Sequence, residues 1–169
     1  MLELGKAGTA GTEKGVVPVL RDGAVVATLR ASNWKDEATA VVGRMVWVYT
    51  KRRGVLTARW TADPEGTARL TARQTSSWRG TWVADLEGAH LEIGPTSLWR
   101  GTRRHTVGGR PVAESGTTGG WSPRPTLTTA PGMPVEHAVF LLWLELVISR
   151  RTNAAVAAGA GAAVIGGTT

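Results

Sequence analysis

The sequence predicts a mainly β fold, an antiparallel closed β-barrel of roughly ten to twelve strands around one apolar C-terminal helix. Two observations support this prediction. Short apolar segments alternate with turn signals roughly every 8 to 12 residues, as in sandwiches and barrels. One longer segment, Ala138–Ile148, is then apolar on every helical face except at Glu145. Such a helix must be surrounded by protein or lipid, and a barrel lumen supplies protein surroundings.

The predicted strands are joined by tight turns. Val16–Leu20 is apolar and precedes Asp22-Gly23, a pair that tolerates the positive φ of hairpin turns. The same order recurs around Asp63–Gly66, Asp85–Gly88 and Gly108-Gly109. In each case the turn residues favour a reversal of the chain between two strands.

The eight tryptophans, against one tyrosine and one phenylalanine, imply large anchors in a core or on a binding surface. Nearly constant spacing separates Trp78, Trp99, Trp121 and Trp143, which indicates a repeated hairpin unit. Because most tryptophans lie among apolar residues, we expect most of them in the core.

The pattern divides the chain into three segments. Residues 1–15 have little apolar content and are expected to form a flexible N-terminal tail. Residues 16–151 are expected to form the barrel, with its central helix at about 134–151. Pro134 suits the first helical turn, and Arg150 and Arg151 suit the negative end of the helix dipole. Residues 152–169 form an Ala/Gly-rich C-terminal tail that continues as a weak helix or frays.

The apolar segment is short for a membrane helix. It spans about 16–21 Å, against a hydrocarbon core of about 30 Å. We therefore expect a helix buried in the barrel and no transmembrane span; a membrane helix and an interfacial helix are the alternatives. The absence of Cys and of an apolar leader suits a cytoplasmic protein, peripheral at the inner membrane face if it binds lipid.

This order of elements resembles the tubby-like C-terminal fold, which tubby proteins, the plant LURP-one-related proteins and phospholipid scramblases share. Hairpins occupy Val16–Glu114, and the candidate central helix occupies Val135–Ile148. The resemblance implies a barrel closed around a hydrophobic helix. It is a resemblance of pattern and assigns no functional residue. The chain has neither the Cys cluster nor the acidic calcium-loop pattern of scramblases.

Two groups of side chains are candidate sites. The net charge of +7 comes from 20 Lys and Arg against 13 Asp and Glu. The clustered cations Lys51, Arg52, Arg53, Arg103 and Arg104 are candidates for binding anions, with solvated turns as the alternative. Within the helix, Glu145 is a candidate buried polar residue. Three alternatives are open for Glu145: contact with a ligand inside the barrel, pairing with an inward-facing Arg, or a position at the barrel mouth.

No catalytic, cofactor-binding or metal-binding signature stands out. The chain has no Cys, and its three His residues lack ligand spacing. The sequence therefore favours a non-enzymatic binding module for anionic lipid or a hydrophobic ligand, with an anionic membrane surface as the partner. The alternatives are a β-rich enzyme or small-molecule carrier with an unrecognised site, and a basic nucleic-acid-binding barrel. Nucleic acid is the less favoured partner, because we expect most tryptophans in the core, whereas binding of single strands needs aromatic residues exposed on a sheet face.

Overall fold

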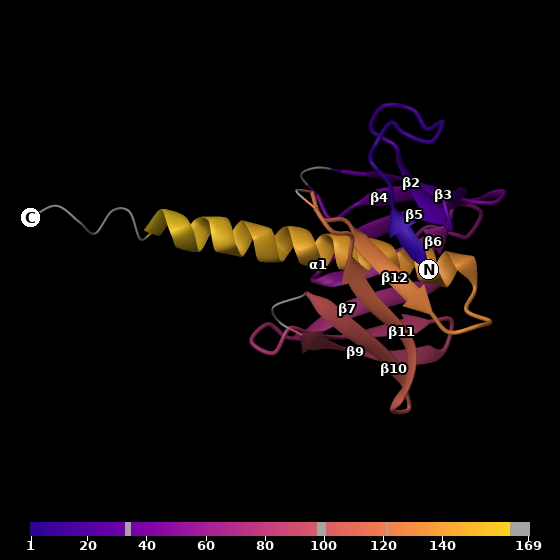
Figure 1. The fold of residues 1–169 in the computed structure, drawn as a ribbon. Coiled ribbons are helices and arrows are strands. Elements are labelled where there is room, and N and C mark those ends of the chain that lie inside the picture. The colour runs from indigo at the N-terminus through magenta and orange to yellow at the C-terminus, as the bar shows by residue number, and fades with distance from the viewer. Residues whose placement is uncertain (33–34, 98–100, 121, 163–169) are drawn as a thin grey trace, which may run out of the picture.

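The protein is a closed antiparallel β-barrel threaded by one helix (Figure 1). The computed structural model describes residues 1–162 except 33–34, 98–100 and 121, and it describes side chains as far as residue 157. Within that part of the chain, each strand pairs with its neighbours in sequence, and the first strand pairs with the last. The predicted fold class is confirmed.

The strands follow one another around the barrel in chain order, and the helix comes last. Their bounds are β1 (Leu2–Leu4), β2 (Val17–Arg21), β3 (Ala24–Ala31), β4 (Ala38–Val42), β5 (Met45–Arg52), β6 (Val55–Trp60), β7 (Leu70–Ser76), β8 (Thr81–Leu86), β9 (Ala89–Ser97), β10 (Thr102–Val107), β11 (Arg110–Thr117), β12 (Pro125–Thr129) and α1 (Val135–Ala162).

Small side chains line much of the lumen and leave room for the helix. Side chains of a strand alternate between its two faces, and β4 shows this clearly: Ala38, Ala40 and Val42 are buried, whereas Thr39 and Val41 are exposed. The other buried strand alanines are Ala27, Ala58, Ala72, Ala84 and Ala113. These alanines leave room for a helix with large apolar side chains on all sides, and larger residues such as Leu56, Leu70 and Leu127 form the rest of the inner wall.

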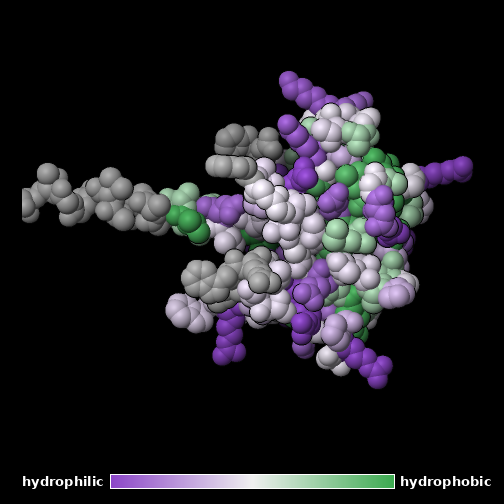
Figure 2. Space-filling view, viewed as in Figure 1, coloured by the Kyte–Doolittle hydropathy of each residue, from purple (hydrophilic) through white to green (hydrophobic). Residues whose placement is uncertain are grey.

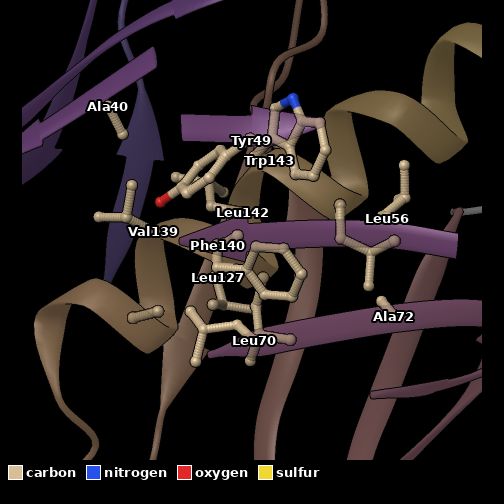
Figure 3. Close-up of a cluster of buried hydrophobic side chains, with 14 of the residues drawn as sticks. Ala40, Tyr49, Leu56, Leu70, Ala72, Leu127, Val139, Phe140, Leu142 and Trp143 are labelled. Carbon is tan, nitrogen blue, oxygen red and sulfur yellow. The ribbon is translucent and has the colours of Figure 1, made fainter. Parts of the chain in front are cut away.

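The barrel section of α1 supplies those large side chains. Phe140, Leu142 and Trp143 are fully buried, and Tyr49 of β5 packs against the two aromatic rings of the helix (Figure 3). The ring centroid of Tyr49 lies 5.6 Å from that of Phe140 and 5.0 Å from that of Trp143. Such edge and tilted contacts are favourable geometries for aromatic pairs. The expectation that this helix is buried in the barrel is confirmed along its apolar segment.

Two segment boundaries differ from the sequence-based expectation. Residues 1–15 are not wholly a tail, because Leu2–Leu4 forms β1, which pairs with both β2 and β12 and closes the barrel. Three residues are too few for a periodic pattern to indicate a strand. At the other end, α1 continues past the expected bound at Arg151 to Ala162, which agrees with the alternative that the C-terminal tail continues as helix. Among the described residues, no helix is both long enough and apolar enough to cross a bilayer.

We expect Trp143→Ala to lower the free energy of unfolding by about 3–5 kcal/mol, because it removes a large side chain from the centre of a packed core. Denaturant unfolding followed by circular dichroism measures this loss. Trp78→Ala is the matched control, since Trp78 is 96% exposed. Equal effects of the two substitutions would contradict the packing described above.

Candidate functional site

The two ends of the barrel differ, because α1 enters at one and leaves at the other. Successive connections of an up-and-down barrel lie at alternate ends. At the entry end, Nε2 of His137 lies 3.2 Å from Oε2 of Glu87 in the β8–β9 turn. At the exit end, Nη1 of Arg150 donates to the carbonyl of Ser32, between β3 and β4, over 2.7 Å. Figure 1 shows the helix projecting beyond the exit end.

Charge separates along the same axis. Charged residues lie in the strand connections and at the two ends of the barrel section of α1. Among those that the structure describes, basic residues outnumber acidic residues at the exit end, and acidic residues outnumber basic residues at the entry end. The exit end has Lys6, Lys14, Lys35, Arg53, Arg79, Arg124, Arg150 and Arg151 against Glu13, Asp36 and Glu37. The entry end has Arg44 and Arg69 against Asp22, Asp63, Glu65, Glu87 and Glu136.

Among the described residues, unpaired cations and one exposed tryptophan lie at the exit end. We call the set of Lys35, Arg52, Arg53, Trp78 and Arg79 the exit surface. All of its members are exposed, and its cations make no ion pair with a described carboxylate. Arg53 has φ 50° and Gly54 has φ 83°, the left-handed pair of a tight hairpin turn. This turn places Arg52 and Arg53 at the tip of the β5–β6 hairpin, and Trp78 and Arg79 lie in the β7–β8 turn.

Lys51, which the sequence grouped with Arg52 and Arg53, has a different role. Its Nζ lies 3.1 Å from Oδ2 of Asp36, and Nη2 of Arg151 lies 2.7 Å from the same oxygen. Burial opposes ionisation of Asp36, but the hydrogen bonds from Arg151 and Lys51 outweigh burial and hold its pKa below the ordinary value. The Arg151 guanidinium also lies 5.3 Å from the ring centroid of Trp82. Lys51 therefore helps to fix the helix where it leaves the barrel.

A polar cluster lies inside the lumen. Glu145 is 3% exposed. Its Oε2 accepts a hydrogen bond from Nη1 of Arg103 over 2.9 Å, and its Oε1 lies 3.2 Å from Nε2 of the fully buried His105. The expected pairing of Glu145 with an inward-facing Arg is confirmed. Nδ1 of His105 and Nε of Arg103 are buried without a hydrogen-bond partner within the described structure.

Arg103 and Arg104 are therefore not part of the exit surface. The two residues are adjacent in β10, so their side chains point to opposite faces of the barrel wall. A register shift between Thr102 and Arg103 accompanies the inward position of Arg103. Arg104 is exposed on the outer face, where its Nη2 lies 4.0 Å from Oε2 of Glu114. The prediction that Arg103 is available to an external anion is wrong, because Glu145 neutralises it in the interior.

A second charge network fixes the start of α1. Arg69 donates to Asp63 through Nε over 2.6 Å and to Glu87 through Nη1 over 3.0 Å. Hydrogen bonds from Arg69 and then from His137 hold the pKa of Glu87 below its ordinary value. The same Arg69 contact holds down the pKa of Asp63. These residues connect the helix to the β6–β7 and β8–β9 connections. Among described residues, no group of three or more His, Cys, Asp or Glu side chains is placed to hold a metal ion.

The sequence did not identify Trp78 and Arg79 as surface residues. The expectation of a mostly buried tryptophan set holds for Trp47, Trp82 and Trp143, but Trp78 is the most exposed large apolar residue of the described chain. The signal was present in the sequence as Ser-Ser-Trp-Arg-Gly, a polar, Gly-containing turn. Trp34, Trp99 and Trp121 lie outside the described residues.

Comparison of the chain with protein-family models, with curated proteins and with solved structures finds no match.

We expect Glu145→Gln to lower the free energy of unfolding by about 3 kcal/mol or more, because it leaves the Arg103 charge buried without a counter-ion. Replacing all three members of the cluster, as Glu145→Leu with Arg103→Met and His105→Leu, should recover most of the loss. Glu114→Gln is the control, since this residue is an exposed partner of Arg104 and such pairs contribute little. A single-variant loss no larger than that of the control would show that the interior pair is dispensable.

We also expect stability to fall in acid partly through Glu87. Its pKa in the folded protein lies below the ordinary value of 4.5, so its contribution is complete above that pH and is lost as the pH falls through the folded-state pKa. Glu87→Gln should reduce the slope of unfolding free energy against pH below about pH 5. Glu65→Gln is the control, because Glu65 forms no ion pair in the described structure. Identical slopes for wild type and Glu87→Gln would refute this assignment.

Proposed function

We propose that this domain is a non-enzymatic binding module that attaches to anionic membrane surfaces through the exit surface. One observation carries the proposal: unpaired cations and an exposed tryptophan lie together at one end of the barrel. Two separate connections, β5–β6 and β7–β8, supply Arg52, Arg53, Trp78 and Arg79. Cations at the end of a barrel can approach a charged plane together.

The chemistry of these side chains suits a lipid interface. Each basic residue close to an anionic leaflet contributes about 1 kcal/mol. Tryptophan partitions to the headgroup level, where its ring is partly in an apolar environment and its N–H reaches polar groups. The tryptophan next to Arg79 therefore adds an attraction that salt does not screen. A solvated basic turn explains the arginines alone, but it does not explain an almost fully exposed Trp78 beside them.

The entry end supports a defined orientation. Glu65 and Glu136 lie there without an ion pair to a described cation, and like charges oppose approach of these groups to an anionic surface. The barrel would then stand with its exit end on the membrane and its entry end in solution. This arrangement corresponds to a peripheral protein at the inner membrane face.

The other function classes receive less support from the described residues. A small-molecule carrier needs room in its lumen, and here Phe140, Leu142 and Trp143 occupy that space. A nucleic-acid barrel needs a stacking platform on a sheet face, whereas Trp47 and Trp82 are buried and the exposed Trp78 lies in a turn. The tubby-like resemblance is part of the same proposal, and the closed barrel around an apolar helix supports it.

The test is binding to vesicles of phosphatidylglycerol and phosphatidylcholine at low salt, measured by sedimentation. Arg52→Ser, Arg53→Asn and Arg79→Ser together should weaken binding about a hundredfold, since three contributions of about 1 kcal/mol are lost. Asn is chosen at position 53 because it tolerates positive φ. The matched control removes the same charge from the entry end through Arg44→Ser in the β4–β5 turn and through Arg21→Ser and Arg110→Ser, at the strand ends beside the β2–β3 and β10–β11 turns.

The control variant should bind nearly as the wild type does, and wild-type binding should weaken as salt rises because the interaction is screened. Equal losses in the two triple variants would show that net charge, not the exit surface, attracts the membrane. If the wild-type protein does not bind anionic vesicles, the proposal is wrong. Tight binding to a single-stranded oligonucleotide without vesicle binding would favour the nucleic-acid alternative.

A further inference from the structure

We infer that the part of α1 beyond Arg151 enters the apolar layer of the membrane on which the exit surface rests. This inference depends on the proposed function and adds a second, uncharged component to it. It concerns a helical segment that leaves the barrel (Figure 1) and that has no partner in the described structure. The side chains of residues 152–157 are all exposed, and Val156 is 67% exposed.

The composition of the segment changes abruptly where it leaves the barrel. Arg150 and Arg151 are its last charged residues, and after Asn153 the sequence to Ala162 is built from Ala, Gly and Val. Figure 2 shows hydrophilic atoms at the base of the projecting helix and hydrophobic ones beyond them. The hydroxyl of Thr152 donates to the carbonyl of Ile148 over 3.0 Å, which satisfies this polar group within the helix.

Water is a poor environment for such a segment. The segment continues a helix that the barrel already nucleates, but none of its described side chains is buried, and each Gly within it, here Gly159 and Gly161, costs up to about 1 kcal/mol relative to Ala. In hydrocarbon the balance changes, because backbone groups have no water to bind and must pair within the helix. Entry into lipid therefore removes the main reason for the segment to unfold.

The geometry matches one leaflet. From Thr152 to Ala162 the helix is about 16 Å long at 1.5 Å per residue, close to half of a hydrocarbon core of about 30 Å. The segment begins at the end of the barrel that carries Arg52, Arg53 and Arg79, so insertion and surface binding occur together. The anchored side chains of Arg150 and Arg151 hold the helix base at the barrel mouth, at the level where cations would meet lipid phosphates.

The experiment uses the absence of Cys from the chain. A single Val156→Cys variant is labelled with the environment-sensitive dye NBD and mixed with the same anionic vesicles. Val41→Cys is the matched control, because Val41 is an exposed apolar residue on the outer face of β4. We expect a blue shift and quenching by lipids that carry a nitroxide deep in the acyl chain for Val156, and neither for Val41. A second variant, Val156→Asp, should weaken vesicle binding at least tenfold, whereas Val41→Asp should not.

The outcomes separate the two proposals. Binding to vesicles with no shift or deep quenching at Val156, and no loss with Val156→Asp, would overturn the insertion while leaving the surface proposal intact. Deep quenching that survives the triple exit-surface substitution would support the insertion and count against the cations. No binding by the wild type would overturn both. A blue shift that depends on protein concentration without vesicles would show instead that the segment pairs with a second copy.

Discussion

Burial of an apolar helix inside the barrel is the interaction on which the rest of this structure depends. Phe140, Leu142 and Trp143 point to different sides of α1, so a single flat sheet could not cover them all. A wall of strands closed around the helix covers every side, and closure also pairs each strand edge. The inward alanines of the strands and the large side chains of the helix are two parts of one packing solution.

Polar contacts fix where the helix stops within this apolar channel. Apolar packing alone discriminates weakly between positions along a channel, because it is not directional. The helix is anchored at its start by His137 on Glu87, in the lumen by Glu145 on Arg103, and at its exit by Arg151 on Asp36. Charged partners placed at three levels resist both sliding and rotation of the helix. These contacts set how far α1 projects beyond the barrel.

The same topology separates the two ends chemically. Alternate connections lie at opposite ends, so residues distant in sequence, such as those of the β5–β6 and β7–β8 turns, contribute to one surface. Cations and Trp78 lie at the exit end, where the uncharged part of α1 beyond Arg151 leaves the barrel, whereas carboxylates outnumber cations in the described connections of the entry end. Under the proposed function, the charged rim and the projecting helix of this barrel would act on different layers of a membrane.

The sequence by itself determined the barrel and the buried helix, and it marked Glu145 as a polar residue inside that helix, with pairing to an Arg as one of the expected alternatives. These features follow from local signals, namely turn residues between short apolar strands and one segment apolar on all faces. It did not determine β1, because three residues carry no measurable period, nor that Arg103 points inward while Arg104 points outward. Tertiary structure alone decided which cations share a surface, since that depends on strand register and on which end each turn occupies. Lys51 looks equivalent to Arg52 and Arg53 in sequence, but Asp36 neutralises it across a contact that only folding creates.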